Sequence, residues 1–332
     1  FFLSREQMSA PHFLSQLPPF RPPKVPLRVG TDCSGLETPI QALRYLNVPY
    51  EHLWSCDRDR HVKASIMANY PPRQFHGDIF ARDHRLLPKV DLYVAGFPCQ
   101  TFSTCGKRAG FADQRGTVFW QCLEAIRYSQ PQAFVLENVR GLLHHEKGHT
   151  FEVIRRELEA LADYDVQWRV LDTKQFGVPH QRHRLYIVGL RKGAFGPFEW
   201  PDPVPLQQSL DDLLGPPVQT GPPLTARQLD ILAQVCQKVD PTEPWCVNLN
   251  LSRVEYCRYN KGFCPCLTAC GHTWWLTHQG RRLTIPELRR LQAVRDDFQQ
   301  VVSDSQFRKQ LGNAMSVNVL CFLLARVLDA ML

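Results

Sequence analysis

A cysteine that follows one apolar run is the residue with the clearest potential for covalent chemistry. The run Val90–Ala95 predicts a short buried strand, and Gly96-Phe97-Pro98-Cys99-Gln100 comes directly after it. Pro98 fixes its own φ and extends the residue before it, so Cys99 is presented on a stiff support where strand gives way to loop. A cysteine in this position is either a small buried hydrophobe or a nucleophile.

A glutamate after a second apolar run supplies a possible partner. The run Ala133–Leu136 predicts another strand, with Glu137-Asn138-Val139 at its tip. Because parallel strands bring their carboxyl ends to one edge of a sheet, where ligands bind, we expect the Glu137 carboxyl beside the Cys99 thiol. Taken alone, Glu137 is equally compatible with a helix cap or a surface position. Together the two side chains predict a reactive site at this edge.

The elements that must position these residues alternate in type along the chain. Strands are expected over Leu27–Asp32, His52–Cys56 and around Phe75, with helices over 40–46 and up to about Tyr70 between them. This rhythm is typical of βαβ units, so we predict an α/β fold in which helices cover both faces of a mostly parallel sheet. Acidic or small residues end the expected strands, at Asp32, Asp57, Asp78, Cys99 and Glu137.

The acids at the strand ends favour a nucleoside ligand without phosphates. The first turn, Cys33-Ser34-Gly35-Leu36, lacks the G-x-G-x-x-G pattern that lets a backbone approach a pyrophosphate. Asp57 suits the two hydroxyls of a ribose, and Asp78 an adenine amino group, although either acid could instead cap a helix. This combination favours S-adenosylmethionine as the cofactor.

Composition divides the 332 residues into an arm and two domains. Residues 1–27 are rich in proline and lack a period, so they are expected to form an extended N-terminal arm. A large domain is predicted from 28–194 together with 282–332, in which Val317–Leu332 has the apolar spacing of a core helix. Prolines mark the start of a smaller domain, 195–281, which shows little helical period.

Charge and cysteine content restrict the partners and the compartment. The net charge of +7 is compatible with a polyanion but does not prove one. The 12 cysteines are scattered through apolar segments, which suits reduced thiols and an intracellular protein, nuclear if eukaryotic and in the cytoplasm or nucleoid if bacterial. No run is long enough to cross a bilayer, so no membrane partner is expected. Because the chain opens on Phe1, regulatory domains or chains upstream of residue 1 are a further expectation.

A group of thiols and an imidazole in the smaller domain raises the question of zinc. Its members lack paired C-x-x-C spacing, so we expect no metal there. They are Cys246, Cys257, Cys264, Cys266, Cys270 and His272.

Six motifs, read in order from residue 28 to 332, resemble those of the DNA (cytosine-5) methyltransferases. They are Gly96–Gln100 with Ser103 (the nucleophile loop), 106–118 (the mobile loop that closes on DNA), Glu137-Asn138-Val139 (the acid motif), Gln181–Arg184 (the paired arginines), Arg282–Gln292 (the return to the large domain) and Gln310–Ala314 (the closure over the cofactor). Any one of these matches could arise by chance, but six in the same order are specific.

The resemblance implies a Rossmann-like methyltransferase fold, with residues 195–281 as an irregular or β-rich target-recognition domain. It implies a monomeric catalytic module that moves a methyl group from S-adenosylmethionine to C5 of a flipped cytosine in double-stranded DNA, through a covalent bond between Cys99 and C6. The implied catalytic residues are Cys99, Glu137, Arg182 and Arg184. The implied cofactor residues are Cys33, Ser34, Gly35, Leu36, Asp57, Arg58, Asp78, Ile79, Gly96, Phe97, Pro98, Val118, Asn313, Ala314 and Met315. The implied contacts to nucleic acid are Gln100, Ser103, Lys107, Arg108, Arg115 and Thr268.

The first cofactor motif departs from the pattern of that family. Cys33 and Glu37 stand where an aromatic residue and a second glycine are usual, and Arg58 where tryptophan is frequent. Two alternatives follow from the resemblance. One is the tRNA-methylating branch, whose Cys-Phe-Thr signature this chain lacks. The other is a catalytically weak, regulatory DNA-binding paralogue, which the altered first motif favours and the presence of Cys99 and Glu137 opposes.

Overall fold

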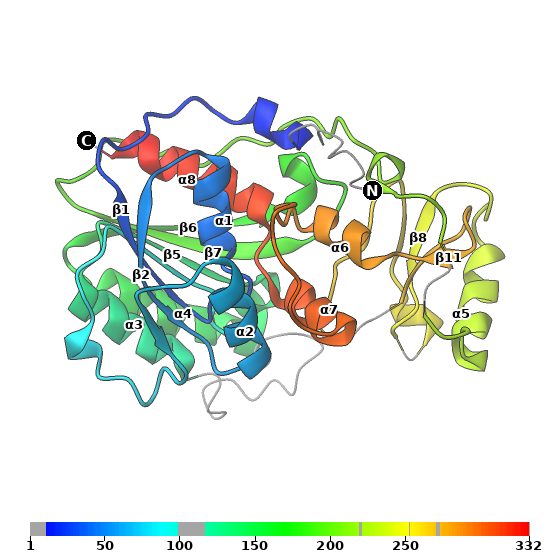
Figure 1. Cartoon of the computed structure of the whole chain (residues 1–332), viewed down its shortest axis with the longest axis horizontal. Helices are drawn as coiled ribbons and strands as arrows, with labels where there is room; N and C mark the ends of the chain where they lie inside the picture. The colour runs from blue at the N-terminus through cyan, green and yellow to red at the C-terminus, as the bar shows by residue number, and fades with distance from the viewer. Residues whose placement is uncertain (1–10, 99–116, 219–220, 252, 270–272, 332) are drawn as a thin grey trace, which may run out of the picture.

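A seven-stranded sheet of order β3-β2-β1-β4-β5-β7-β6 is the framework of the molecule (Figure 1). The computed structural model describes residues 11–98, 117–218, 221–251, 253–269 and 273–331. Strand β7 runs antiparallel to its neighbours β5 and β6, whereas the other pairings are parallel. The predicted α/β fold with a mostly parallel sheet is confirmed. The strands are β1 (Leu27–Asp32), β2 (Tyr50–Cys56), β3 (Gln74–His76), β4 (Leu92–Ala95), β5 (Ala133–Val139), β6 (Tyr164–Asp172) and β7 (His183–Arg191).

Helices cover both faces of this sheet because its central strands are apolar on both sides. Along β4, Val94 belongs to the core on one face and Tyr93 to the core on the other. This is why the sequence shows a continuous apolar run there and not an alternating one. Figure 1 shows α1 (Thr38–Tyr45) and α8 (Val317–Ala330) over one face, and α3 (Val118–Ser129) and α4 (His149–Glu159) over the other.

The predicted C-terminal core helix is confirmed as α8, which packs against α1. Contrary to the expectation that no run is long enough to cross a bilayer, the segment Asp304–Ala330 is long and apolar enough to do so among the described residues, with a mean hydropathy of 1.6 over an 18-residue window. It is 89% buried inside the molecule and is divided into α7 (Asp304–Asn313) and α8. Its apolar composition is therefore explained by its place in the core.

A smaller sheet of order β11-β10-β8-β9 lies beside the large one (Figure 1). It confirms the β-rich character expected of the smaller domain. Its strands are β8 (Trp245–Asn248), β9 (Tyr259–Lys261), β10 (Trp274–Leu276) and β11 (Arg281–Arg282). The chain then returns to the large domain through α6 (Ile285–Leu291), and α2 (Arg60–Asn69) follows β2 in the chain.

Two local expectations need correction. The smaller domain contains a regular helix, α5 (Ala226–Cys236), which begins at a capping box made by Thr225 and Gln228. The helical period was not evident because α5 buries only Ile231 and Val235. The N-terminal arm is not wholly extended, since His12–Gln16 forms a 3-10 helix in which the side chain of Phe13 is buried against the Tyr45 ring, with 5.7 Å between ring centroids.

Candidate active site

Strand pairing places Glu137 directly beyond the end of β4. The last residue of β4, Ala95, pairs with Leu136, and β5 continues through Val139 because it also pairs with β7. The sequence had suggested that Glu137 follows the tip of a strand. It lies instead inside β5. Its side chain is buried, with Oε1 lying 3.0 Å from Nε of Arg184. Burial raises the pKa of Glu137, and the two nearby arginines only partly oppose this rise.

The residues that lead to the expected nucleophile are fixed by Asn138, the neighbour of Glu137. Asn138 donates a hydrogen bond from Nδ2 to the carbonyl oxygen of Phe97, 3.2 Å away. The Phe97 ring is itself buried against Phe119, at 5.8 Å between centroids. Asn138 was not predicted as a site residue, although it belongs to the acid motif. Cys99 and the predicted nucleic-acid contacts Gln100, Ser103, Lys107, Arg108 and Arg115 lie outside the described residues.

The paired arginines occupy two different environments. The guanidinium of Arg182 is buried and donates to three backbone carbonyl oxygens, those of Leu267 at 2.8 Å, Ala314 at 2.7 Å and Gly312 at 3.2 Å. Arg182 thereby joins the smaller domain to the segment after α7. Of the two arginines, Arg184 is the one paired with Glu137. The sequence had assigned both to catalysis without separating their roles.

A second thiol, which sequence reasoning did not place in the site, lies against these arginines. Cys266 Sγ is 3.6 Å from Nη1 of Arg182 and 3.9 Å from Nη2 of Arg184. Burial opposes ionisation of this thiol, yet the positive charges of Arg184 and Arg182 hold its pKa below the usual value. The predicted Thr268, two residues further on, is exposed.

The expected cofactor turn lies between β1 and α1, and it is tied to the end of β2. Gly35 donates its backbone N–H to Oδ2 of Asp57 at 3.1 Å, and Ser34 donates to the carbonyl oxygen of Cys56 at 3.2 Å. Oδ1 of Asp57 accepts from the backbone of Asp59 at 3.0 Å. Cys33 and Gly35 have φ values of 51° and 54°, so the turn is tight.

The other predicted cofactor residues come from several elements and differ in their exposure. Arg58, Asp78 and Asn313 are exposed, whereas Leu36, Ile79, Phe97, Val118, Ala314 and Met315 are buried and Gly96 and Pro98 are partly exposed. A Cβ placed on Gly96 would lie 3.0 Å from the Met315 methyl and 4.0 Å from the carbonyl oxygen of Cys33. Glycine thus keeps space where the turn, β4 and the segment after α7 meet. Together with the acids Asp57 and Asp78, these residues fit an adenosine-containing cofactor.

A buried ion pair that sequence reasoning missed supports this turn. Both oxygens of Asp32, the last residue of β1, accept from Arg82 at 2.7 Å, and Oδ2 also accepts from the Tyr93 hydroxyl at 2.8 Å. Asp32 therefore anchors the loop that follows Ile79 and is not free to hold a ligand.

The thiols considered for zinc in the smaller domain do not form a metal-ligating group within the described part of the chain. No group of three or more metal-ligating side chains is found among the described residues. Cys246 and Cys264 do approach, with 3.7 Å between their sulfur atoms. Cys270 and His272 lie outside the described residues.

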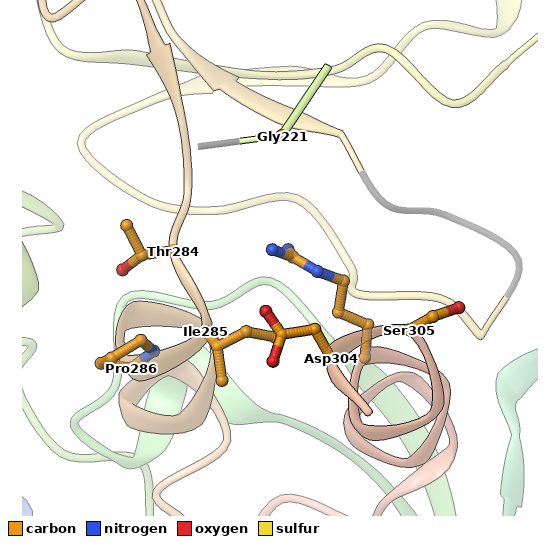
Figure 2. A pocket seen from close by; sticks show the side chains of 7 residues that line it. Gly221, Thr284, Ile285, Pro286, Asp304 and Ser305 are labelled. Carbon is orange, nitrogen blue, oxygen red and sulfur yellow. The ribbon is translucent and has the colours of Figure 1, made fainter. Parts of the chain in front are cut away.

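A cavity of about 400 Å³ lies between the starts of α6 and α7 (Figure 2). It contains none of the predicted site residues. Its lining consists of Gly221, Thr284, Ile285, Pro286, Asp304, Ser305 and Arg308.

The sheet order, the cofactor turn and the buried Glu137 together define a methyltransferase with a Rossmann-like fold. The chain belongs to the family of the C-5 cytosine-specific DNA methylases, whose model matches residues 33–241 and 252–328. This family assignment confirms the resemblance drawn from the six motifs.

Known relatives of this chain include bacterial type II methyltransferases. It is 36% identical over 276 residues to M.NgoBI of Neisseria gonorrhoeae, covering 81% of this chain and 83% of that protein. It is 29% identical over 285 residues to M.HhaI of Haemophilus parahaemolyticus, covering 82% and 86%. The DNMT2 mutant of Spodoptera frugiperda shares the fold, with a TM-score of 0.67, 17% identity and coverage of 91% and 99%.

Proposed function

We propose that this chain methylates C5 of cytosine in double-stranded DNA with S-adenosylmethionine as the methyl donor, and that Cys99 is its nucleophile. The observation that carries the proposal is the arrangement around Glu137. A buried carboxyl with a raised pKa, paired with Arg184, lies next to the asparagine that fixes the residues leading to Cys99. The matching family, described as the C-5 cytosine-specific DNA methylases, does not favour the tRNA alternative.

The thiol of Cys99 supplies what the cytosine ring lacks, since C5 is a weak nucleophile. Addition of the thiolate to C6 forms a carbon–sulfur bond and moves an electron pair toward C5, which can then take the methyl group. S-adenosylmethionine, when bound, would supply that methyl group by cleavage of its sulfur–methyl bond, with S-adenosylhomocysteine as the leaving group. A base then removes the C5 proton, the double bond reforms, and the sulfur leaves as a thiolate.

Glu137 and Arg184 have complementary tasks in this scheme. Burial raises the pKa of Glu137 and so favours a proton on its carboxyl, which can be shared with N3 of the ring as C6 is attacked. The Arg184 guanidinium, at 3.0 Å, orients the Glu137 carboxyl. Arg182 is a positioning residue in this proposal, since its donors are committed to backbone carbonyl oxygens.

The substrate base must leave the duplex for this chemistry to occur, because C6 is not reachable in a stacked base. The basic residues Lys107, Arg108 and Arg115 are proposed to contact phosphate groups, and residues 195–281 to read base edges. The net charge of +7 supports a polyanionic substrate.

Methyl transfer from labelled S-adenosylmethionine to duplex DNA and to tRNA tests this proposal directly. We expect incorporation into DNA, located at cytosine by bisulfite sequencing, and none into tRNA. Cys99→Ser should abolish incorporation while the protein still folds and binds the cofactor. Turnover by that variant, or a preference for tRNA, would contradict the proposal. Cofactor binding without turnover by the unaltered chain would instead support the regulatory paralogue.

A further inference from the structure

The turn between β1 and α1 carries a buried glutamate in a backbone conformation that favours glycine. Glu37 has a φ of 51° and a ψ of 46°, and its side chain is fully buried. The left-handed conformation is unfavourable for residues with a Cβ, and burial of a carboxyl is unfavourable unless its atoms are bonded. The side-chain contacts of Glu37 must offset both costs.

Those contacts run from the turn to β1 and β2. Oε1 of Glu37 is hydrogen-bonded to the hydroxyls of Thr31, at 2.9 Å, and of Ser55. It also lies 3.6 Å from Nε2 of His52. Oε2 is buried and has no hydrogen-bond partner among the described residues. Glu37 therefore fastens the turn to β2, but it does so without a cation beside it.

A count of protons assigns the carboxyl to its neutral form. His52 Nδ1 lies 3.0 Å from the carbonyl oxygen of Tyr70, which can only accept, so Nδ1 carries a proton. In a neutral ring Nε2 must then accept, and the Ser55 hydroxyl at 3.0 Å is its donor. Because Ser55 has one proton to give, its bond to Glu37 must be donated by the Glu37 carboxyl.

The pKa values of this group agree with that count. Burial raises the pKa of Glu37 to about 8, even though the Ser55 and Thr31 hydroxyls would donate to the carboxylate once it ionises. The titratable groups that face it are His52, Tyr50 and Asp57. Burial lowers the pKa of His52 to about 4 and raises that of Tyr50, so both are neutral near pH 7. None of the three supplies a compensating positive charge.

We propose that Glu37 is a positioning residue for the cofactor, whose protonated carboxyl fastens the β1–α1 turn to β2. That turn places the backbone N–H of Gly35 3.1 Å from Oδ2 of Asp57, the expected ribose acid. Ionisation of Glu37 places an uncompensated charge in the core and releases the turn. Cofactor affinity should therefore fall at alkaline pH. This inference rests on the proposed use of S-adenosylmethionine.

Calorimetric titration of S-adenosylmethionine between about pH 6.5 and 9.5 tests the proposal. For the unaltered protein, Kd should rise by up to about tenfold per pH unit above about pH 8. Glu37→Gln keeps a neutral group of the same shape, so its Kd should stay flat. Glu37→Gly relieves the backbone but removes the tie, so its Kd should be about tenfold or more higher at every pH.

A matched control is available on the same strand. Glu51 is partly exposed on β2 and is paired with Arg73 at 2.9 Å, so Glu51→Gln should keep the unaltered pH profile. An alkaline rise in Kd that is the same in Glu37→Gln as in the unaltered protein would overturn the proposal. Unchanged affinity for S-adenosylmethionine in Glu37→Gly would overturn it as well, because the turn would then support cofactor binding without the Glu37 side chain.

Thermal unfolding of the cofactor-free protein separates this inference from the proposed function. In the unfolded chain the carboxyl ionises near its ordinary value of 4.5, and in the folded chain near 8. Its contribution to stability is therefore complete below about pH 4.5 and is lost as the pH rises to about 8. The melting temperature of the unaltered protein should fall across this window relative to that of Glu37→Gln. If this difference appears but the protein binds no S-adenosylmethionine, the protonated Glu37 carboxyl is supported and the proposed cofactor is contradicted.

Discussion

Glu137 is buried beside a cation, and these two surroundings shift the pKa of its carboxyl in opposite directions. Burial raises its pKa, while Arg184 at 3.0 Å limits the rise. The carboxyl group of a glutamate exposed to water loses its proton well below neutral pH. The environment of this residue thus matters to its role as much as its identity does.

Glu137→Gln should lower kcat by about 10²–10⁴-fold, because the amide cannot give a proton to the ring. In the unaltered enzyme at saturating cofactor, kcat should fall as the pH rises through the elevated pKa of Glu137. The variant should lack this alkaline decline. Initial rates of methyl transfer over a pH series measure both effects. A variant with unchanged kcat would exclude Glu137 as the acid.

Cys266 should react with iodoacetamide roughly tenfold faster than Cys236 near pH 7.5. Both thiols are partly exposed, but arginines lower the pKa of Cys266 despite its burial, whereas burial raises that of Cys236 on α5. Mass spectrometry of the labelled peptides gives the two rates within one sample. Arg184→Gln should slow the labelling of Cys266 alone. Equal rates in the unaltered protein would contradict the assigned electrostatics.

At the scale of elements, close approach of backbones determines how the smaller domain meets α7. Gly312 lies in the last turn of α7, and a Cβ there would collide with the backbone of Thr268 and Ala269. A side chain at this position would separate the cofactor side of the molecule from the segment that contains Cys266.

Gly312→Ala should therefore destabilise the protein by up to about 2 kcal/mol. Alanine favours a helix by about 1 kcal/mol over glycine, but overpacking against rigid backbone costs about 1–3 kcal/mol. Urea unfolding measures the difference. Gly77→Ala is the control, since no atom lies within 4 Å of its Cβ position, and its effect should stay within about 0.5 kcal/mol. Greater stability in Gly312→Ala would show that α7 can move.

The elements that the sequence predicted best are those with a single strong apolar signal. Strand β1 was predicted with its observed bounds, and α8 to within two residues. Strand β6 was not recognised because much of it is exposed, including Trp168. The reversed direction of β7 has no local signal, since it follows from pairing with β5.

The site was predictable where residues close in sequence act together. The acid motif and the nucleophile loop each follow an apolar run, so their positions could be inferred. Contacts between distant segments could not. Asn138 meets Phe97 across 41 residues, and Arg182 meets Cys266 across 84. Only the packing of the smaller domain on the larger one shows that Arg182 is buried.

At the scale of the whole molecule, Arg182 connects the two sheets through backbone carbonyl oxygens on both sides. Its guanidinium reaches Leu267 in the smaller domain and Ala314 beyond α7. His180 reinforces the junction, with Nδ1 donating to the carbonyl oxygen of Leu291 at 3.0 Å and Nε2 accepting from the backbone of Leu267 at 3.1 Å. The two domains therefore share one hydrogen-bonded junction.

Arg182→Lys should mainly lower the stability of the protein, whereas Arg184→Lys should mainly lower kcat. Lysine cannot reach three carbonyl oxygens at once, so Arg182→Lys should reduce the free energy of unfolding by about 3–5 kcal/mol. Arg184→Lys keeps a cation beside Glu137, so it should reduce the free energy of unfolding by less than Arg182→Lys does while lowering kcat by about 10²-fold. Urea unfolding and methyl-transfer rates measure the two quantities. The reverse pattern would exchange the roles assigned to these arginines.

The position of α8 has a consequence for how the chain folds during its synthesis. This helix covers β1 and packs on α1, yet it begins 285 residues after β1 ends, at Val317 against Asp32. The hydrophobic face of β1 therefore stays uncovered until the segments between β1 and α8 have left the ribosome. Long-range closure of this kind slows folding. A nascent chain should consequently depend on chaperones, and one that is interrupted before α8 should yield aggregated protein and no partial methylation.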